Sequence, residues 1–225
     1  MARHALVTGA SSGIGAAIVD RLLTEGWQVT GVARRAVSRD TPAFAGITAD
    51  LADPEGADTV LGAVRGVTAF IHAAGVMSTA PLGGLDAAAG AAMWRLHVAA
   101  AERLADGLVA GLPAGGRIIL IGSRTATGAA ARSQYAATKA ALVAMARSWA
   151  IELAPRGITA NVVAPAATET PMLTAPTRTG VPPRVPPIGR LIQPAEVAAA
   201  VAFLASAEAG AITGQVLTLC GGSSL

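Results

Sequence analysis

A glycine-rich segment near the N-terminus limits the folds open to this chain more than any other feature. Residues 4–8 form a short apolar run, an apolar-periodic stretch begins at residue 16, and Gly9-Ala-Ser-Ser-Gly13-Ile-Gly15 lies between them. Glycines between a strand and a helix let the backbone approach a pyrophosphate, and the helix N-terminus offers unpaired N–H groups. A glycine loop can also be only a tight turn. Its place at the opening of a βα unit favours a dinucleotide site, built from Gly9, Ser11, Ser12, Gly13, Ile14 and Gly15.

The alternation of short apolar runs with helix-like stretches continues along the chain. The runs at 27–33, 47–51, 68–72, 116–122, 158–164 and 214–219 predict further strands, and helices are expected from 53 onward and at 86–112, 134–153 and 195–206. Strands that alternate regularly with helices form parallel sheets. We therefore expect an α/β, doubly wound, Rossmann-type parallel sheet of about seven strands with helices on both faces. With no linker visible, residues 1–225 read as a single domain.

Composition excludes several other classes of protein. Hydrophobic residues make up 52% of the chain, but alanine and glycine supply much of this, and no apolar run reaches the about 18 residues of a membrane span. A single cysteine, Cys220, and three scattered histidines argue against a disulfide framework and against a metal site. The N-terminus lacks a signal-peptide pattern, which favours a cytoplasmic protein. The net charge of +3 comes from dispersed arginines, so nucleic-acid binding is not expected.

The most chemically specific segment runs from Ser123 to Lys139. Tyr135 is the only tyrosine, and Lys139 is the only lysine because 16 of the 17 basic residues are arginine. Residues four apart share a helix face, so the ammonium would lie beside the phenol, favour the phenolate and lower the phenol pKa from about 10. Ser123 would then offer a neutral donor to a substrate oxygen. The alternative is a surface lysine and a half-buried tyrosine on an ordinary amphipathic helix.

The end of the second predicted strand bears on cofactor choice. An acidic residue there would bind the ribose 2′-hydroxyl of NAD, whereas arginine accommodates the 2′-phosphate of NADP. The chain reads Ala33-Arg34-Arg35, and its next acid is Asp40. NADP(H) is therefore favoured and NAD(H) remains open. The alternative reading of Arg34 and Arg35 is two solvated side chains at the start of a loop.

Together these segments resemble the short-chain dehydrogenase/reductase family, in its compact single-domain branch, over nearly the whole chain. The resemblance implies that the glycine loop binds the cofactor and that Asp50-Leu51 contacts the adenine. It implies further cofactor contacts from residues that follow the fourth and sixth strands: Ala73, Ala74, Gly75, Pro165, Thr168 and Thr170.

The same resemblance gives the catalytic positions to Ser123, Tyr135 and Lys139. Tyr135 would exchange the proton with the alcohol oxygen, Lys139 would lower the phenol pKa and hold the nicotinamide ribose, and Ser123 would orient the carbonyl. His97 stands where the family often has asparagine, and either holds a relay water or merely packs. The proline-rich segment 166–193 would cover the substrate.

The expected function is an NADP(H)-dependent oxidoreductase that interconverts a secondary alcohol and a ketone on a small or medium-sized, including cyclic, molecule. The alternatives are an NAD-dependent alcohol dehydrogenase on the same fold, and a nicotinamide-binding regulatory protein without turnover. An epimerase or dehydratase is a weaker alternative. The resemblance also implies a homodimer or homotetramer formed through the two long helices.

Overall fold

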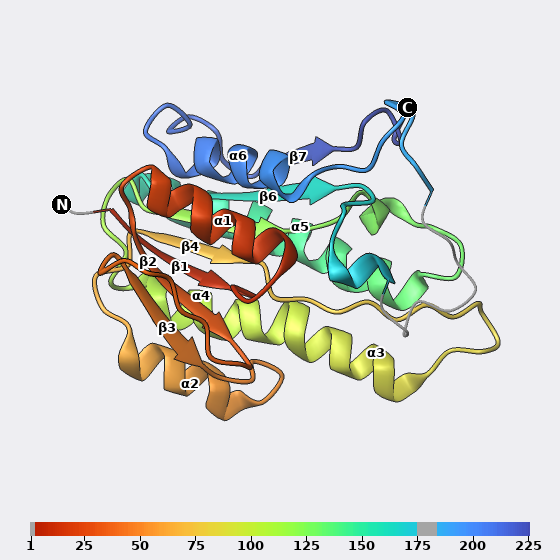
Figure 1. The fold of residues 1–225 in the computed structure, drawn as a ribbon, viewed down its shortest axis with the longest axis horizontal. Helices are drawn as coiled ribbons and strands as arrows, with labels where there is room; N and C mark the ends of the chain where they lie inside the picture. The colour runs from red at the N-terminus through yellow and green to blue at the C-terminus, as the bar shows by residue number, and fades with distance from the viewer. Residues whose placement is uncertain (1–2, 175–183) are drawn as a thin grey trace.

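A single parallel sheet organises the molecule. The computed structural model describes residues 3–174 and 184–225, and its seven strands follow the order β3-β2-β1-β4-β5-β6-β7 (Figure 1). The doubly wound α/β sheet expected from the sequence is confirmed. The strands are β1 His4–Thr8, β2 Gln28–Ala33, β3 Phe44–Thr48, β4 Ala69–His72, β5 Arg117–Ile121, β6 Thr159–Pro165 and β7 Val216–Leu219.

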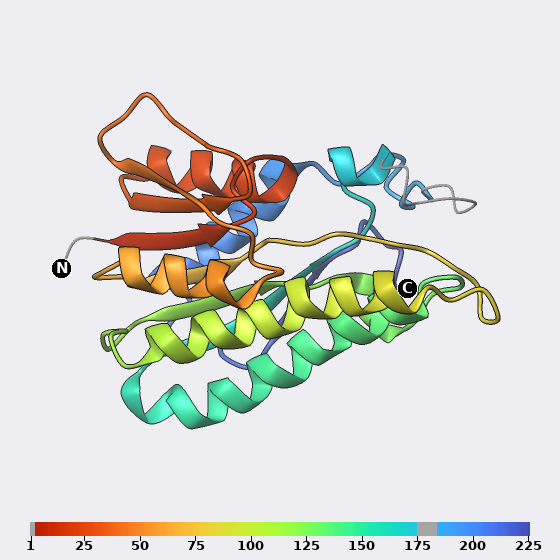
Figure 2. The same ribbon diagram turned by 90° about the horizontal axis from the view of Figure 1, so that it is seen from below.

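Helices cover both faces of this sheet. One face carries α1 (Gly13–Thr24) and α6 (Pro194–Ala205), which pack on each other. The other carries α2 (Pro54–Ala63), α3 (Ala87–Trp94), α4 (Ala100–Val109) and α5 (Ser133–Leu153), seen side by side in Figure 2. Short helical turns complete the structure: η1 Arg95–Ala99, η2 Arg124–Thr127, η3 Ala154–Arg156 and η4 Pro171–Thr174.

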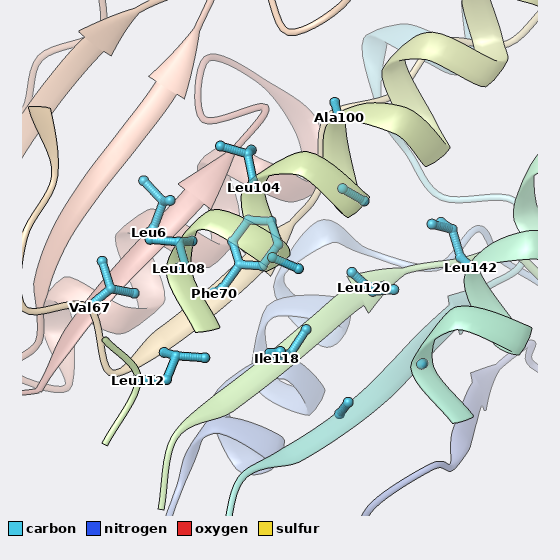
Figure 3. Packing of buried hydrophobic residues seen from close by; sticks show 14 of the residues in the cluster. Leu6, Val67, Phe70, Ala100, Leu104, Leu108, Leu112, Ile118, Leu120 and Leu142 are labelled. Atoms are coloured by element: carbon cyan, nitrogen blue, oxygen red, sulfur yellow. The ribbon is translucent and has the colours of Figure 1, made fainter. Parts of the chain in front are cut away.

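The core forms two layers because successive strand side chains point to opposite faces. Leu6 and Phe70 belong to the layer under α2, α4 and α5, shown in Figure 3. Their neighbours Val7 and Ile71 belong to the layer under α1 and α6. Burial on both faces explains why the central strands read as continuous apolar runs rather than as alternating ones.

The strand order reverses between β1 and β4, which are neighbours in the sheet. Connections leave these two strands in opposite directions, and the crevice that opens at their carboxyl ends is where such sheets bind ligands. The glycine loop follows β1, residues 73–75 follow β4, and Ser123 comes two residues after β5. The fold therefore brings three of the predicted site segments to one edge.

Two predicted elements differ from the structure. The third strand spans Phe44–Thr48 rather than 47–51, because its ladder with β2 ends where Ala33 pairs with Thr48. The helix predicted at 86–112 is interrupted by the π-helical turn η1, in which the Ala100 N–H bonds to the Arg95 carbonyl. Of the prolines in the predicted cover segment, Pro176, Pro182 and Pro183 lie outside the described residues.

Candidate active site

The glycine loop is packed so closely that side chains have no room at two of its positions. A Cβ on Gly15 would collide with the Gly9 carbonyl, and a Cβ on Gly9 would lie 2.9 Å from the Ala73 carbonyl and the Ala74 nitrogen. Gly9 also has φ +72°, in the left-handed region that favours glycine. The loop therefore packs backbone against backbone at these two positions, Gly9 against residues 73 and 74 and Gly15, in the first turn of α1, against Gly9.

A buried hydroxyl–imidazole pair fixes the residues that follow β4. Thr8 Oγ1 accepts the N–H groups of Ala73 and Ala74, each at 3.0 Å, and lies 3.0 Å from His72 Nδ1. His72 Nε2 lies 3.0 Å from the Leu96 carbonyl, which can only accept, so the ring carries its proton on Nε2 and Thr8 donates to Nδ1. Burial lowers the His72 pKa to about 3, which keeps the ring neutral. This network joins β1, β4 and η1 beneath the glycine loop.

A cavity of about 250 Å³ occupies the crevice. It runs from Arg34 and Arg35 past the glycine loop to Ser123, Tyr135 and Lys139. The other predicted site residues on its wall are Gly9, Ser11, Ser12, Gly13, Ile14, Gly15, Asp50, Leu51, Ala73, Ala74, Gly75, His97, Pro165 and Thr170.

Thr168 is the one predicted site residue that does not line this cavity. It is buried, its hydroxyl donates to the Ala166 carbonyl, and its backbone bridges to Ile192. Its observed contacts therefore tie the chain after β6 to the segment before α6.

Tyr135 and Lys139 face the same cavity from successive turns of α5, as their spacing predicted. Their side chains are buried, and Lys139 Nζ lies 5.8 Å from the centre of the Tyr135 ring. The ammonium donates to the Ile121 carbonyl at the end of β5, at 2.8 Å. Burial lowers the Lys139 pKa from 10.5 to about 7, because removal from water disfavours the charged form. A cation that can lose its proton near neutral pH therefore lies beside the phenol.

Ser123 lines the same cavity, where the chain leaves β5. Its extended backbone caps the short helix η2, and its Oγ accepts the Thr125 N–H at 3.2 Å. The Thr125 hydroxyl lies 2.8 Å from the same Oγ. A serine hydroxyl, a phenol and an ammonium thus line one side of the cavity, a set able to bind a carbonyl oxygen and deliver a proton to it.

His97 is held by protein groups at both ring nitrogens. Nε2 accepts the Val76 N–H at 3.0 Å, and Nδ1 lies 2.8 Å from Thr138 Oγ1. The Thr138 hydroxyl donates to the Tyr135 carbonyl, so Nδ1 donates to Thr138. Burial lowers the His97 pKa well below its usual value, and the ring stands edge-on to Tyr135 with 5.7 Å between ring centres. Neither ring nitrogen is left for a relay water, which corrects that part of the hypothesis from the sequence.

Comparison with known proteins decides the family. Residues 9–224 match the family model described as enoyl-(acyl carrier protein) reductase. The 3-oxoacyl-(acyl-carrier-protein) reductases FabG of Vibrio cholerae and Escherichia coli K12 are 36% and 38% identical, over 97% of this chain and 96% of each relative. The chain belongs to the short-chain dehydrogenase/reductase family. It is accordingly an NAD(P)-dependent oxidoreductase that acts on CH–OH or C=O groups.

Solved short-chain dehydrogenase/reductase structures agree with this fold and with a nicotinamide cofactor. A short-chain dehydrogenase of Burkholderia cenocepacia J2315 in complex with NADP is 31% identical, has a TM-score of 0.89, and covers 99% of this chain and 98% of its own. A 3-ketoacyl-(acyl-carrier-protein) reductase of Brucella melitensis complexed with NADH is 27% identical, with a TM-score of 0.89 and the same coverage. The expectation of NADP(H), with NAD(H) open, is in line with these complexes.

Sequence reasoning missed several residues of this short-chain dehydrogenase/reductase site. Thr125 and Thr138 each bond to a group on the cavity wall, and Val76 lines the cavity directly. A threonine within two residues of a predicted site residue was the available signal for Thr125 and Thr138. For the described residues, no group of three or more histidine, cysteine, aspartate or glutamate side chains is placed to hold a metal. Nor is any helix of those residues long and apolar enough to cross a membrane.

Proposed function

We propose that this protein uses NADPH to reduce a ketone on a small or medium-sized molecule to a secondary alcohol. The observation that carries the proposal is the buried Lys139 ammonium beside the Tyr135 phenol, with the Ser123 hydroxyl on the same cavity wall. The relatives named as 3-oxoacyl-(acyl-carrier-protein) reductases make 3-oxoacyl thioesters the first substrates to test. Cyclic ketones are the second class.

Each of the three side chains has a distinct task in this reaction. Ser123 donates a hydrogen bond that orients the carbonyl oxygen, and Tyr135 transfers its proton to that oxygen as the carbonyl carbon accepts a hydride. The Lys139 charge stabilises the phenolate that remains. NADPH, when bound, supplies the hydride. The phenolate then regains a proton from solvent, which completes the cycle.

His97 supports this set through contacts rather than through proton transfer. Its ring lies edge-on against Tyr135 and bonds to Thr138, whose hydroxyl reaches the Tyr135 carbonyl. The other ring nitrogen holds Val76 after β4. We therefore assign His97 the role of holding the first turn of α5, and with it the phenol, against the cavity floor.

The residues proposed to bind the cofactor lie along the cavity wall. The glycine loop would hold the pyrophosphate, since its packed backbone leaves the first turn of α1 facing the crevice. Arg34 and Arg35 are exposed at the far end of the cavity, where they can meet a ribose 2′-phosphate. Asp50 and Leu51 border the same end and would contact the adenine. Arginine pairs strongly with phosphate, which supports NADP(H) over NAD(H).

We further propose that residues 1–225 act as one domain in which 166–193 covers the substrate. Both core layers draw residues from the N-terminal and C-terminal halves of the chain. Thr170, Pro171 and Met172 line the cavity, and the Thr170 methyl lies 3.1 Å from the position a Cβ on Gly13 would take. The start of the proposed cover is thus already seated against the glycine loop.

We also propose that two copies associate through the helices opposite α1 and α6. A groove of about 660 Å³ lies between α2, α4 and α5, and its wall carries the two arginines Arg95 and Arg103 and the four acids Asp53, Glu102, Asp106 and Glu152. A two-fold contact presents the same surface on both copies, so a face that carries both signs of charge can complement itself. The cytoplasmic location inferred from the sequence stays a prediction.

The decisive experiment is a carbonyl panel with the wild-type chain and Tyr135→Phe. We expect wild-type NADPH oxidation with at least one ketone, and a loss of about 1,000-fold or more in kcat for the variant, because general acid catalysis by one group contributes roughly 10²–10⁴-fold. NADPH affinity should survive, since phenylalanine keeps the ring. Turnover retained by Tyr135→Phe would exclude the phenol as the acid. Tight NADPH binding without turnover on any carbonyl would instead support the regulatory protein.

A further inference from the structure

A second hydroxyl stands directly behind Ser123. Thr125 lies in η2, its side chain is 4% exposed, and it does not line the cavity. Its backbone N–H and its hydroxyl both lie within hydrogen-bond distance of Ser123 Oγ, at 3.2 Å and 2.8 Å. We propose that Thr125 is a positioning residue that commits the Ser123 hydroxyl to donating toward the substrate oxygen. This inference rests on the proposed function of the same site.

The direction of the bond between the two hydroxyls follows from burial. If Ser123 donated to Thr125, the buried Thr125 proton would need another acceptor, and Ser123 Oγ is its one recorded hydroxyl partner within the described residues. A buried donor without an acceptor is costly. If Thr125 donates to Ser123, its proton is satisfied within the protein. The Ser123 proton is then free to point into the cavity that Ser123 lines.

This arrangement limits what Ser123 can recognise. A serine hydroxyl has one proton and two acceptor lone pairs. The Thr125 N–H and the Thr125 O–H occupy both lone pairs, so the only remaining capacity is donation. Ser123 is thus suited to a carbonyl or alkoxide oxygen, and Tyr135 alone is left to transfer a proton. A hydroxyl that itself accepts a hydrogen bond is also a stronger donor, because chains of hydrogen bonds polarise one another.

Substitution of Thr125 tests whether this residue acts through Ser123. Thr125→Val keeps the shape and the backbone N–H but removes the hydroxyl, and we expect kcat to fall about 5- to 10-fold, the equivalent of one neutral hydrogen bond. The KM for NADPH should stay unchanged, and Thr125→Ser should restore kcat. Thr127→Val is the matched control, because Thr127 is exposed in the same short helix and bonds only to the Arg124 carbonyl in the described structure.

A double-mutant cycle separates positioning from a merely structural role. In a Ser123→Ala background, Thr125→Val should cost nothing further, because the group through which Thr125 acts is absent. An equal loss of kcat in both backgrounds would overturn the proposal. So would an unchanged kcat for Thr125→Val in the otherwise wild-type chain.

Neutron diffraction from crystals of the full chain exchanged into D₂O provides a measurement that needs no substrate. Deuterium on Thr125 Oγ1 directed at Ser123 Oγ would support the inference, and deuterium on Ser123 Oγ directed at Thr125 would overturn it. This result stands apart from the proposed function. A protein that reduces no carbonyl would refute the reductase and leave the hydroxyl orientation to be decided by diffraction.

Discussion

Replacing the only lysine should make the ligand-free protein more stable, by an amount that depends on pH. Lys139 is 4% exposed, its recorded hydrogen bond goes to the neutral Ile121 carbonyl, and no ion pair involving it is found in the part of the chain that the structure describes. Burial therefore penalises the ammonium and lowers its pKa from 10.5 to about 7. Lys139→Met has a similar length and removes the charge.

The size and sign of this effect follow from proton linkage. Between pH 7 and 10.5 the unfolded chain binds more protons at this position than the folded chain, so the lysine's contribution to stability rises with pH across that window. Each pKa unit is worth about 1.4 kcal/mol, which sets an upper limit of roughly 5 kcal/mol for the whole shift. The cost of burial is complete below pH 7 and absent above 10.5. Lys139→Met should therefore be more stable than wild type near pH 6, and the difference should narrow as pH rises.

Urea unfolding of both proteins at several pH values between 6 and 10 measures this difference directly. The protein must be free of nucleotide, because a ligand that binds only the native state adds its own stabilisation. Arg147→Met is the matched control: Arg147 is exposed on the same helix, so its effect should not change over this pH range. A constant difference between wild type and Lys139→Met, or a variant less stable at pH 6, would refute the inference that the buried ammonium is destabilising.

Two further predictions concern cofactor choice and assembly. Arg34→Ala combined with Arg35→Ala should raise the KM for NADPH about 30-fold, from the loss of charge-assisted bonds worth roughly 2 kcal/mol, and leave that for NADH unchanged. Arg39→Ala is the control, because Arg39 pairs with Asp20 at 2.6 Å. Equal effects of the double substitution on the KM values of both cofactors would contradict the assignment of Arg34 and Arg35 to the 2′-phosphate. In sedimentation, wild type should show twice the 22.2 kDa chain mass. Ala99→Arg, on the groove wall, should give monomer, whereas Ala207→Arg, at an exposed position just after α6 on the other face, should not. A monomeric wild type would remove the proposed interface.

The central sheet was predictable because its strands are buried on both faces. The strands β4, β5 and β6 are buried throughout, and each contains consecutive apolar residues instead of an apolar–polar alternation along its whole length. The glycine loop also indicated the order of the first two elements, since it requires a strand before it and a helix after it. Local pattern and overall fold agree at these segments, which is why the predicted fold class was correct.

The third strand was misplaced because it lies at the edge of the sheet. Its residues Phe44–Thr48 are partly or fully exposed and so lack the apolar signal of a buried strand. Leu51 is buried, at 6% exposure, but it packs in the core after the strand has ended. The sequence-based boundary therefore followed the buried leucine instead of the backbone pairing with β2.

The contacts within the site are likewise of two kinds: some join residues close together in the sequence, and others join residues far apart in it. Tyr135 and Lys139 could be paired from the sequence because residues four apart on a helix share a face. The partners of His97 could not, since Val76 and Thr138 lie 21 and 41 residues away along the chain. Only the packed fold shows that the imidazole has no nitrogen left for water.

Two buried cations show why a chain whose other basic residues are all arginine has one lysine. Arg117 is 6% exposed and spreads its guanidinium over the carbonyls of Gly115, Gly116 and Ser206, so its fork of donors is engaged by protein. Lys139 carries three donors, and in the described residues one of them is bonded, to Ile121. The remaining two lie at a cavity wall, where hydroxyls of a bound ribose or the phenolate of Tyr135 can accept them. An arginine would keep its charge at any working pH and would need a planar acceptor. The compact, ionisable lysine at this position is therefore explained by the two N–H donors that it keeps available at the cavity wall. The stability lost by burying its charge follows from that role.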